Sequence, residues 1–254
     1  CGYNARNIAA VTFTNKAARE MKERAMLLNP ATQESLIATF HSMCVRILRR
    51  EADHIGYSRN FTIVDPGEQR TLMKRIMKDL NLDPKQWSER TILGTISNAK
   101  NDLIDEVAYE MQAGDFYTEI VARCYKAYQK ELRQSEAMDF DDLIMKTIQL
   151  FESSPETLEF YQRKFRYIHV DEYQDTNHAQ YALTKILAAQ WRNICVVGDA
   201  DQIVHCQMND RRFTVNSGSI AELDVAKFAL NILEGTKPAF DNRRHKYEAF
   251  PELS

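Results

Sequence analysis

The chain has 254 residues, 44% apolar and 27% charged, with a formal net charge of -3, which suits a globular core and excludes a generally basic nucleic-acid coat. No apolar run approaches the roughly 18 to 20 residues of a membrane span and no signal-like segment opens the sequence, so we predict a cytoplasmic protein that makes no membrane contact. The five cysteines are odd in number and form no CxxC pair, which argues against a disulfide framework and a zinc site.

Four short apolar runs have the composition of buried strands. They are rich in β-branched or aromatic residues and end at polar residues, as parallel strands do when helices cover both faces of their sheet. The runs are 8–13, 36–40, 167–170 and 194–197. They predict an α/β fold in which helices flank a parallel sheet.

Two helices are marked clearly in the first third of the chain. Apolar residues recur at helical spacing through 15–28, so a helix should follow the first strand. Asp65 is placed to cap a second helix, because Pro66 would take its first position and Glu68 stands three residues after the cap. This helix should run to about Leu80.

Two further regions show helical character. Residues 81–138 have helical periodicity and no convincing strand, and they separate the second apolar run from the third by far more than a usual connection. We therefore predict an inserted all-helical subdomain. Near the end of the chain, Ser219 and Glu222 form a capping box and Gly235 a stop signal, which predict a helix over 220–234.

Two adjacent carboxylates, Asp171 and Glu172, end the third apolar run. Ligands of open α/β sheets bind beyond the carboxyl ends of the strands, where this pair could meet a metal ion and a water molecule. Asp171 could bind Mg²⁺ through water while Glu172 orients and deprotonates the attacking water. The alternative is an Asp-Glu pair that stabilises the N-terminus of a helix through the helix dipole.

A second polar cluster, 198–202, ends the fourth apolar run. Gly198 permits a tight turn, and the neutral amide of Gln202 could report whether a terminal phosphate is present. Taken alone, such residues more often form a polar loop. Two such clusters at strand ends of one sheet favour a shared nucleotide site.

A third signal lies at the ends of the first two apolar runs, in segments 12–16 and 39–42. Each segment combines an aromatic ring with small hydrogen-bonding side chains, which suits base stacking and phosphate contacts with a single strand. Residues 1–50 hold eight Lys or Arg against three Glu, a local charge of +5. The candidate contacts are Thr12, Phe13, Asn15, Lys16, Thr39 and His41.

The alternative for these two segments is structural. Phe13 and Phe40 could be core residues, and Asn15 could serve as a helix cap.

Taken together, the segments resemble the superfamily 1A DNA helicases of the UvrD/PcrA/Rep type, and most of all the PcrA group. TFTNKAAREM (12–21) is similar to motif Ia, ATFHSMCVRILRRE (38–51) to the DNA-contacting motif that follows, and MDFDDLI (138–144) to the return from the helical insertion. VDEYQDTNHAQY (170–181) resembles the Walker B motif, and VVGDADQ (196–202) resembles motif III. The likeness is nearly continuous from about residue 5 to residue 202.

The resemblance implies an ATP-driven motor that moves 3′ to 5′ along single-stranded DNA and separates duplexes in repair and plasmid replication. It implies ATP and Mg²⁺ as cofactors, single-stranded DNA and single-strand/duplex junctions as partners, and a monomer. Carried over by motif, Asp171 would be the Mg²⁺ aspartate, Glu172 the catalytic base and Gln202 the γ-phosphate contact. Phe13, Asn15 and His41 would lie along the single DNA strand.

The resemblance also implies a division into subdomains. Residues 1–80 and 139–202 would form the RecA-like subdomain 1A, and 81–138 the helical subdomain 1B. Residues 203–254 resemble nothing in the family, and we expect a divergent tail there.

The sequence departs from the family at the loop that should hold ATP. A Walker A loop needs Gly-x-x-x-x-Gly-Lys-Ser/Thr, and none of the eight glycines is followed by Lys. In the family this loop precedes motif Ia, so we expect the chain to begin after it, and we expect the second RecA-like domain to be missing too. We predict little or no ATP turnover by this chain alone. A non-catalytic DNA-binding or interaction module is the alternative, and a metal-dependent nuclease is a weaker third hypothesis.

Overall fold

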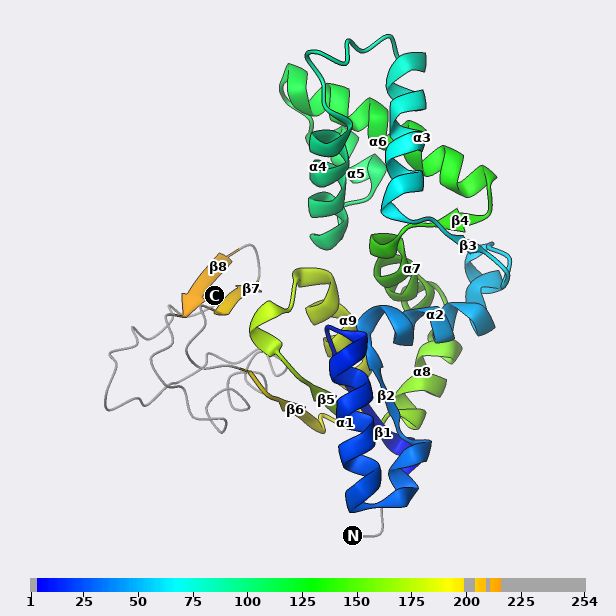
Figure 1. The fold of residues 1–254 in the computed structure, drawn as a ribbon, viewed down its shortest axis with the longest axis vertical. Coiled ribbons are helices and arrows are strands. Elements are labelled where there is room, and N and C mark those ends of the chain that lie inside the picture. Colours follow the sequence, from blue (N-terminus) through cyan, green and yellow to red (C-terminus); the bar gives the residue numbers. More distant parts are fainter. Residues whose placement is uncertain (1–3, 199–203, 209–210, 216–254) are drawn as a thin grey trace. The chain divides into compact units, whose positions relative to one another are not determined.

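The computed structural model describes residues 4–198, 204–208 and 211–215 (Figure 1). The chain forms two compact units. Unit 1 is drawn from Cys1–Met43 and Pro155–Ser254, and unit 2 is Cys44–Ser154. Among the described residues, no helix combines the length and the apolar character that a membrane-spanning segment needs.

Unit 1 is built on a parallel sheet of four strands in the order β2-β1-β5-β6. The strands are β1 (Ile8–Thr12), β2 (Leu36–Thr39), β5 (Tyr167–Val170) and β6 (Ile194–Val196). All four predicted strands and the parallel sheet are confirmed, and no predicted run exceeds its strand by more than one residue. Because β2 lies on one side of β1 and β5 on the other, the strand order reverses at β1.

The register of the sheet brings the carboxyl ends of its strands level. Thr12 of β1 pairs with Thr39 of β2, while Val170 of β5 pairs with Val11 on one side and Val196 on the other. The three valines are buried, as expected for strands covered by helices. Polar residues that follow the strands therefore emerge along one edge.

The helices of unit 1 follow from local signals. They are α1 (Asn15–Leu28), α8 (Pro155–Lys164) and α9 (His178–Ala188). The predicted bounds of α1 are confirmed, but the cap is Thr14, whose hydroxyl accepts a hydrogen bond from Ala17 N at 3.1 Å. Asn15 is therefore the first residue of the helix, and its alternative role as a cap is wrong. Helix α1 packs on β1 and β2, and α9 packs on β5 (Figure 1).

An antiparallel pair, β7 (Val204–Met208) and β8 (Arg211–Val215), lies in the region expected to be a divergent tail. This hairpin is not among the predicted elements. The helix predicted over 220–234 lies outside the described residues.

Unit 2 is mainly helical. Its elements are α2 (Phe40–Glu51, which begins in unit 1), β3 (Thr62–Ile63), α3 (Pro66–Asp79), α4 (Glu89–Asn101), α5 (Glu106–Gln112), α6 (Phe116–Gln134), β4 (Ala137–Met138) and α7 (Phe140–Ser153). The capping box that opens α3 is confirmed, since Asp65 accepts from Glu68 N and Glu68 accepts from Asp65 N. The helix ends at Asp79, next to the predicted Leu80.

The prediction that 81–138 contains no strand is wrong at its last two residues. There β4 pairs in parallel with β3, and two residues are too short to produce an alternating pattern. The rest of the predicted insertion is helix and loop. It lies wholly within unit 2, which extends beyond the insertion at both ends. The division into subdomains 1A and 1B stays a prediction.

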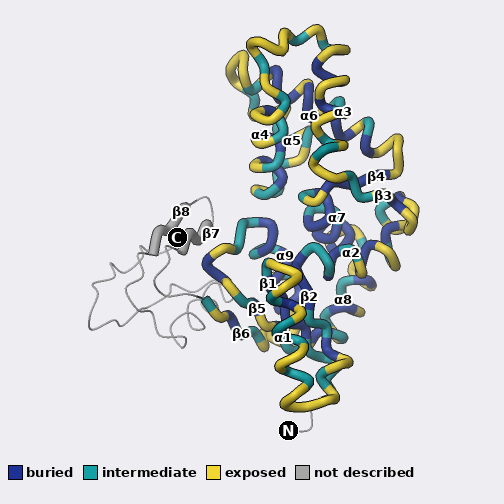
Figure 2. Tube along the Cα trace, viewed as in Figure 1, coloured by how far each residue is buried: buried dark blue, intermediate teal, exposed yellow. Residues whose placement is uncertain are grey.

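The core of unit 2 forms where the inner faces of its helices meet (Figure 2). Its members include Met73, Ile76, Ile92, Ile96, Val121, Tyr125, Tyr128 and Leu132. The spacing of four between Ile92 and Ile96 and between Val121 and Tyr125 places each pair on one helix face. Burial of these faces, rather than helix propensity alone, stabilises the unit.

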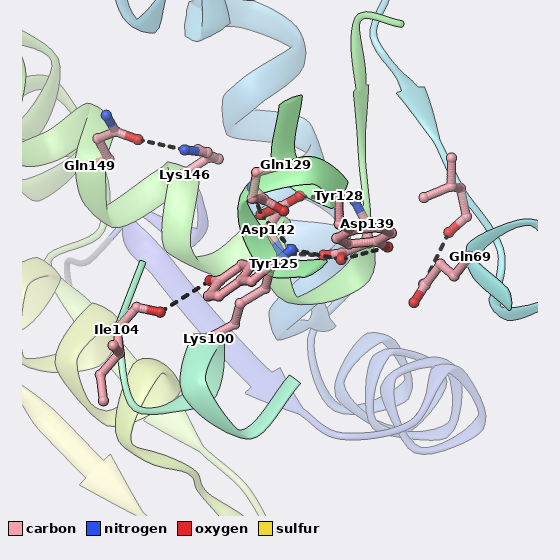
Figure 3. A network of polar contacts seen from close by, with 11 residues as sticks. Gln69, Lys100, Ile104, Tyr125, Tyr128, Gln129, Asp139, Asp142, Lys146 and Gln149 are labelled. Atoms are coloured by element: carbon pink, nitrogen blue, oxygen red, sulfur yellow. Dashed lines mark hydrogen bonds and ion pairs between the residues drawn. The ribbon is translucent and has the colours of Figure 1, made fainter. Parts of the chain in front are cut away.

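One charged cluster is buried beside this core (Figure 3). The ammonium of Lys100 lies 2.7 Å from Asp139 Oδ2 and 2.9 Å from Asp142 Oδ1. Tyr128 donates its hydroxyl to Asp139 at 3.0 Å, and Gln129 donates its amide to Asp142 at 3.2 Å. Burial by itself would lower the pKa of Lys100, but the two carboxylates outweigh it and raise that pKa.

Candidate nucleotide and nucleic-acid site

The carboxyl edge of the sheet in unit 1 gathers the predicted site residues that the structure describes. Thr12 ends β1, and Asp171 directly follows the neighbouring strand β5. The strand order reverses between these two strands, which is the place where ligands of open α/β sheets bind. Asp171 N donates to Val11 O at 2.9 Å, which extends the pairing of the two strands by one residue. The edge is therefore held by backbone hydrogen bonds up to the first carboxylate.

Asp171 is only partly buried at this edge. Thr12, fully buried, places its hydroxyl 3.4 Å from Asp171 Oδ2, a long hydrogen bond that orients one carboxylate oxygen. Thr12 contacts only this one of the two carboxylate oxygens of Asp171. A carboxylate fixed in this way can hold a water molecule of a Mg²⁺ shell.

Glu172 is exposed and takes a left-handed backbone conformation, with φ of 53°. Such a conformation is costly for a residue other than glycine and is found mainly where surrounding structure imposes it. Gln174, which is buried, donates its amide to Glu172 Oε2 at 2.5 Å. The carboxylate of Glu172 is thus directed by a neighbour that the sequence patterns do not single out.

Gly198 brings the end of β6 against this turn. Tyr173 N donates to Val197 O at 3.0 Å, and a Cβ atom on Gly198 would stand 2.7 Å from Gln174 Oε1. Gly198 is therefore needed for a close approach between the two strand ends, a reason that differs from the predicted tight turn. Gln202 lies outside the described residues, so its place relative to Glu172 stays a prediction.

The two phenylalanines of the candidate DNA segments have different environments. Phe40 is only 1% exposed and is a core residue, as the structural alternative expects. Phe13 is partly exposed and meets Phe40 edge to face, with ring centroids 5.8 Å apart. The ring of Phe13 therefore rests on the core with part of its surface open.

The second DNA segment begins helix α2. Thr39 is buried, accepts a hydrogen bond from Ser42 N at 3.1 Å and donates to the Ser42 hydroxyl at 2.9 Å. The hydroxyl of Thr39 thus serves the start of the helix. His41 is partly buried, and this burial lowers its pKa, so the ring is neutral at physiological pH.

Two of the candidate contacts are exposed to solvent. Asn15 and Lys16 are exposed at the start of α1, and the ammonium of Lys16 lies 3.9 Å from Glu20. An ion pair at this distance between exposed side chains contributes little stability. Lys16 is free to exchange Glu20 for a phosphate.

The described residues contain no group of three or more His, Cys, Asp or Glu side chains placed to hold a metal ion together. Mg²⁺ at Asp171 would therefore take most of its ligands from water and nucleotide phosphates, as it does in many phosphate-binding sites.

Comparisons with known proteins match the chain over most of its length. A family profile described as the UvrD/REP helicase N-terminal domain matches residues 1–206. A protein named ATP-dependent DNA helicase PcrA from Bacillus subtilis (strain 168) is 58% identical over 200 residues, which cover 78% of this chain and 27% of that relative.

Two further relatives carry the same name. Those from Staphylococcus epidermidis (strain ATCC 12228 / FDA PCI 1200) and Staphylococcus aureus (strain NCTC 8325 / PS 47) are 56% and 54% identical over the same coverage. The chain spans 27% of the length of these curated relatives.

Proposed function

The chain belongs to the UvrD/REP helicase family, and we propose on that basis that it forms part of the motor of an ATP-dependent 3′–5′ DNA helicase. The proposed substrates are single-stranded DNA and single-strand/duplex junctions, met by a cytoplasmic monomer during repair and replication. The observation that carries the proposal is the meeting of Thr12, Asp171 and the Glu172–Gln174 turn at one sheet edge.

ATP hydrolysis is proposed for the Asp171 end of this edge. Asp171 would hold Mg²⁺ through water, and that ion would neutralise charge on the phosphates. Glu172 would accept a proton from the attacking water, and the hydrogen bond from Gln174 keeps its carboxylate in place. Gln202 would contact the terminal phosphate.

DNA binding is proposed for the neighbouring strand ends, β1 and β2. The open face of Phe13 would stack on a base, and the neutral ring of His41 would donate a hydrogen bond. Asn15 and Lys16 are exposed where the next phosphate would lie. Thr12 and Thr39 are buried, so we propose that they hold the two DNA-binding segments in position from the core side.

This chain alone should bind ATP feebly. Backbone donors aimed at phosphate normally supply much of nucleotide affinity, and no Walker A sequence is present to supply them. We expect calorimetry to detect no micromolar binding of Mg-ATP. Micromolar affinity would contradict this part of the proposal.

Equilibrium binding to a labelled single strand, with ATPase measured alongside, tests the DNA part. Phe13→Ala should weaken binding about ten-fold, because stacking on an aromatic ring is worth roughly 1 to 3 kcal/mol. Phe116→Ala, which removes an equally large and more exposed ring from unit 2, is the matched control and should have no effect. An unchanged affinity in folded Phe13→Ala would remove Phe13 from the DNA site.

The same measurements separate the alternatives. Single-strand binding without any turnover supports the non-catalytic module for this chain in isolation. Mg²⁺-dependent DNA cutting that disappears in Glu172→Gln would instead support the nuclease hypothesis.

A further inference from the structure

Helix α5 and the start of α6, both in unit 2, carry large apolar side chains on the surface. Met111 is 81% exposed, Phe116 is 66% exposed and Val107 is 49% exposed. Val107 and Met111 stand four residues apart in α5, so they form a short apolar row on one face of the helix. Single exposed apolar residues are ordinary, whereas a local concentration of them is typical of an interaction site.

This apolar row faces away from the core of unit 2. Helix α5 packs beside α6 (Figure 1), and the ring of Tyr109 on α5 meets the ring of Tyr125 on α6 edge to face, with centroids 6.0 Å apart. Val107 and Met111 are each two positions from Tyr109. Two helical steps of about 100° place them on nearly the opposite side of α5, where the core does not reach them.

Acidic side chains accompany the apolar row. Residues 101–122 contain six Asp or Glu and no Lys or Arg. Glu106 and Glu110 have the same spacing as the apolar residues and come one position before them, so they form a second row beside the first. Glu110 forms an exposed ion pair with Lys126 at 2.8 Å, which is weak enough to be exchanged for another cation.

Phe116 lies at the end of these two rows, and together they form the α5 surface. The ring of Phe116 rests against Trp87, with centroids 6.0 Å apart, so it is supported although it is exposed. The nearest cations in the chain at this end are Lys85 and Arg90, on either side of Trp87, and Arg123, two helical turns further along α6. The acidic character therefore belongs to α5.

We infer that the α5 surface binds a basic amphipathic helix of a partner protein. Apolar side chains of that helix would cover Val107 and Met111, and Lys or Arg beside them at a spacing of four would meet the acidic row. Charge complementarity carries the choice of partner. Nucleic acid and anionic lipid suit the surface less well, because Glu106 and Glu110 would repel their phosphates.

A second copy of this chain offers a poorer match. Helix α1 is basic, with four Lys or Arg against two Glu, and it ends in two exposed leucines, Leu27 and Leu28. These leucines are adjacent in the chain, so they point about 100° apart and form no row to lie along Val107 and Met111. The partner helix should instead have apolar residues at spacings of three and four.

The test uses the whole chain and a labelled synthetic peptide of about 18 residues, with leucines at helical spacing and lysines beside them. Fluorescence anisotropy should show binding that weakens as salt is added, because exposed charges are screened. The same peptide with Glu in place of Lys should bind about ten-fold more weakly. Equal binding of the two peptides would overturn the inference, because charge would then play no part.

Two double variants test the two rows separately. Val107→Ala with Met111→Ala keeps good helix formers in α5 and should weaken binding of the lysine peptide about ten-fold. Glu106→Gln with Glu110→Gln should weaken it about five-fold at low salt and should make the remaining binding less dependent on salt.

Matched variants remove similar groups elsewhere. Leu27→Ala with Leu28→Ala removes two even more exposed apolar side chains from α1, and Asp79→Asn with Glu152→Gln removes two exposed charges from unit 2. Neither pair should change peptide binding. Hydrogen exchange of the unmodified protein should slow within residues 106–119 when the peptide is bound, a measurement that needs no variant to fold.

Unchanged affinity in both α5 double variants, or slower exchange only outside 106–119, would overturn the inference. An oligonucleotide affinity that falls in Val107→Ala with Met111→Ala as much as the peptide affinity would also overturn it and assign the surface to nucleic acid. Self-association seen by sedimentation velocity and lost in this variant would assign the surface to a second copy. Each of these results leaves the proposed nucleotide site in unit 1 standing.

Discussion

The acidic residues of the two units differ in what surrounds them. In unit 2, Asp139 and Asp142 are buried against Lys100 and receive hydrogen bonds from neighbouring helices. In unit 1, Asp171 and Glu172 end a strand with one oriented contact each and with solvent beside them. The comparison teaches that burial and saturation of hydrogen bonds separate an acid that serves the fold from one that is available to a ligand.

The largest expected effect comes from breaking the buried cluster. Lys100→Met leaves two carboxylates buried without their cation and should lower the free energy of unfolding by about 3 to 5 kcal/mol. Urea denaturation followed by circular dichroism measures this. Lys126→Met, which removes an exposed lysine paired with Glu110 at 2.8 Å, should cost at most about 1 kcal/mol. Equal costs for the two variants would contradict the comparison.

The second expected effect depends on pH. Burial, together with the nearby Asp139 carboxylate, raises the pKa of Asp141 from 3.8 to about 6. The folded state then binds more protons than the unfolded state between these values, so Asp141 lowers stability as the pH rises from about 4 to about 6.

Asp141→Asn should remove this dependence and stabilise the protein at pH 7 by up to about 3 kcal/mol. Thermal or urea unfolding of both proteins from pH 4 to pH 7 measures the difference. Glu152→Gln, an exposed carboxylate on the same helix, is the control and should leave the curve unchanged. If Asp141→Asn shifted the curve of stability against pH without changing its slope, the pH dependence would not come from Asp141.

A smaller effect is expected at the close approach of the two strand ends. Gly198→Ala forces the buried amide of Gln174 to move and should cost about 1 to 2 kcal/mol. Gly94→Ala is the matched control, because its Cβ meets nothing within 4 Å in the interior of α4, and it should stabilise by up to about 1 kcal/mol. Unfolding by urea gives both values, and a neutral Gly198→Ala would show that Gln174 is not fixed.

The smallest effect sharpens the comparison at Glu172. Glu172→Gly relieves the left-handed conformation and should raise the free energy of unfolding by about 0.5 to 1 kcal/mol, although it removes the proposed catalytic carboxylate. Asn81→Gly, at a φ of 56°, should gain less, because asparagine tolerates this conformation. Destabilisation in Glu172→Gly would mean that the carboxylate serves the fold after all.

Local signals in the sequence predict much of this fold. The four strands, helix α1 and the Asp65–Glu68 capping box that opens α3 follow from patterns within a few residues, so they need no tertiary information. Elements that depend on distant partners are missed or misplaced. The two-residue strand β4, for example, exists only because β3 lies beside it.

By itself, the sequence determined the α/β class and the order of residues at the strand ends, because composition and periodicity are properties of neighbours in the chain. The helicase family came from the resemblance of its motifs to those of known members. Only the tertiary structure decided that Phe40 is core while Phe13 stays partly open, and that Gln174 directs Glu172. It alone decided that Gly198 is needed for a close approach and that Lys100 lies between Asp139 and Asp142. Such properties arise from contacts between segments far apart in sequence, and burial at those contacts sets which polar groups remain available to a ligand.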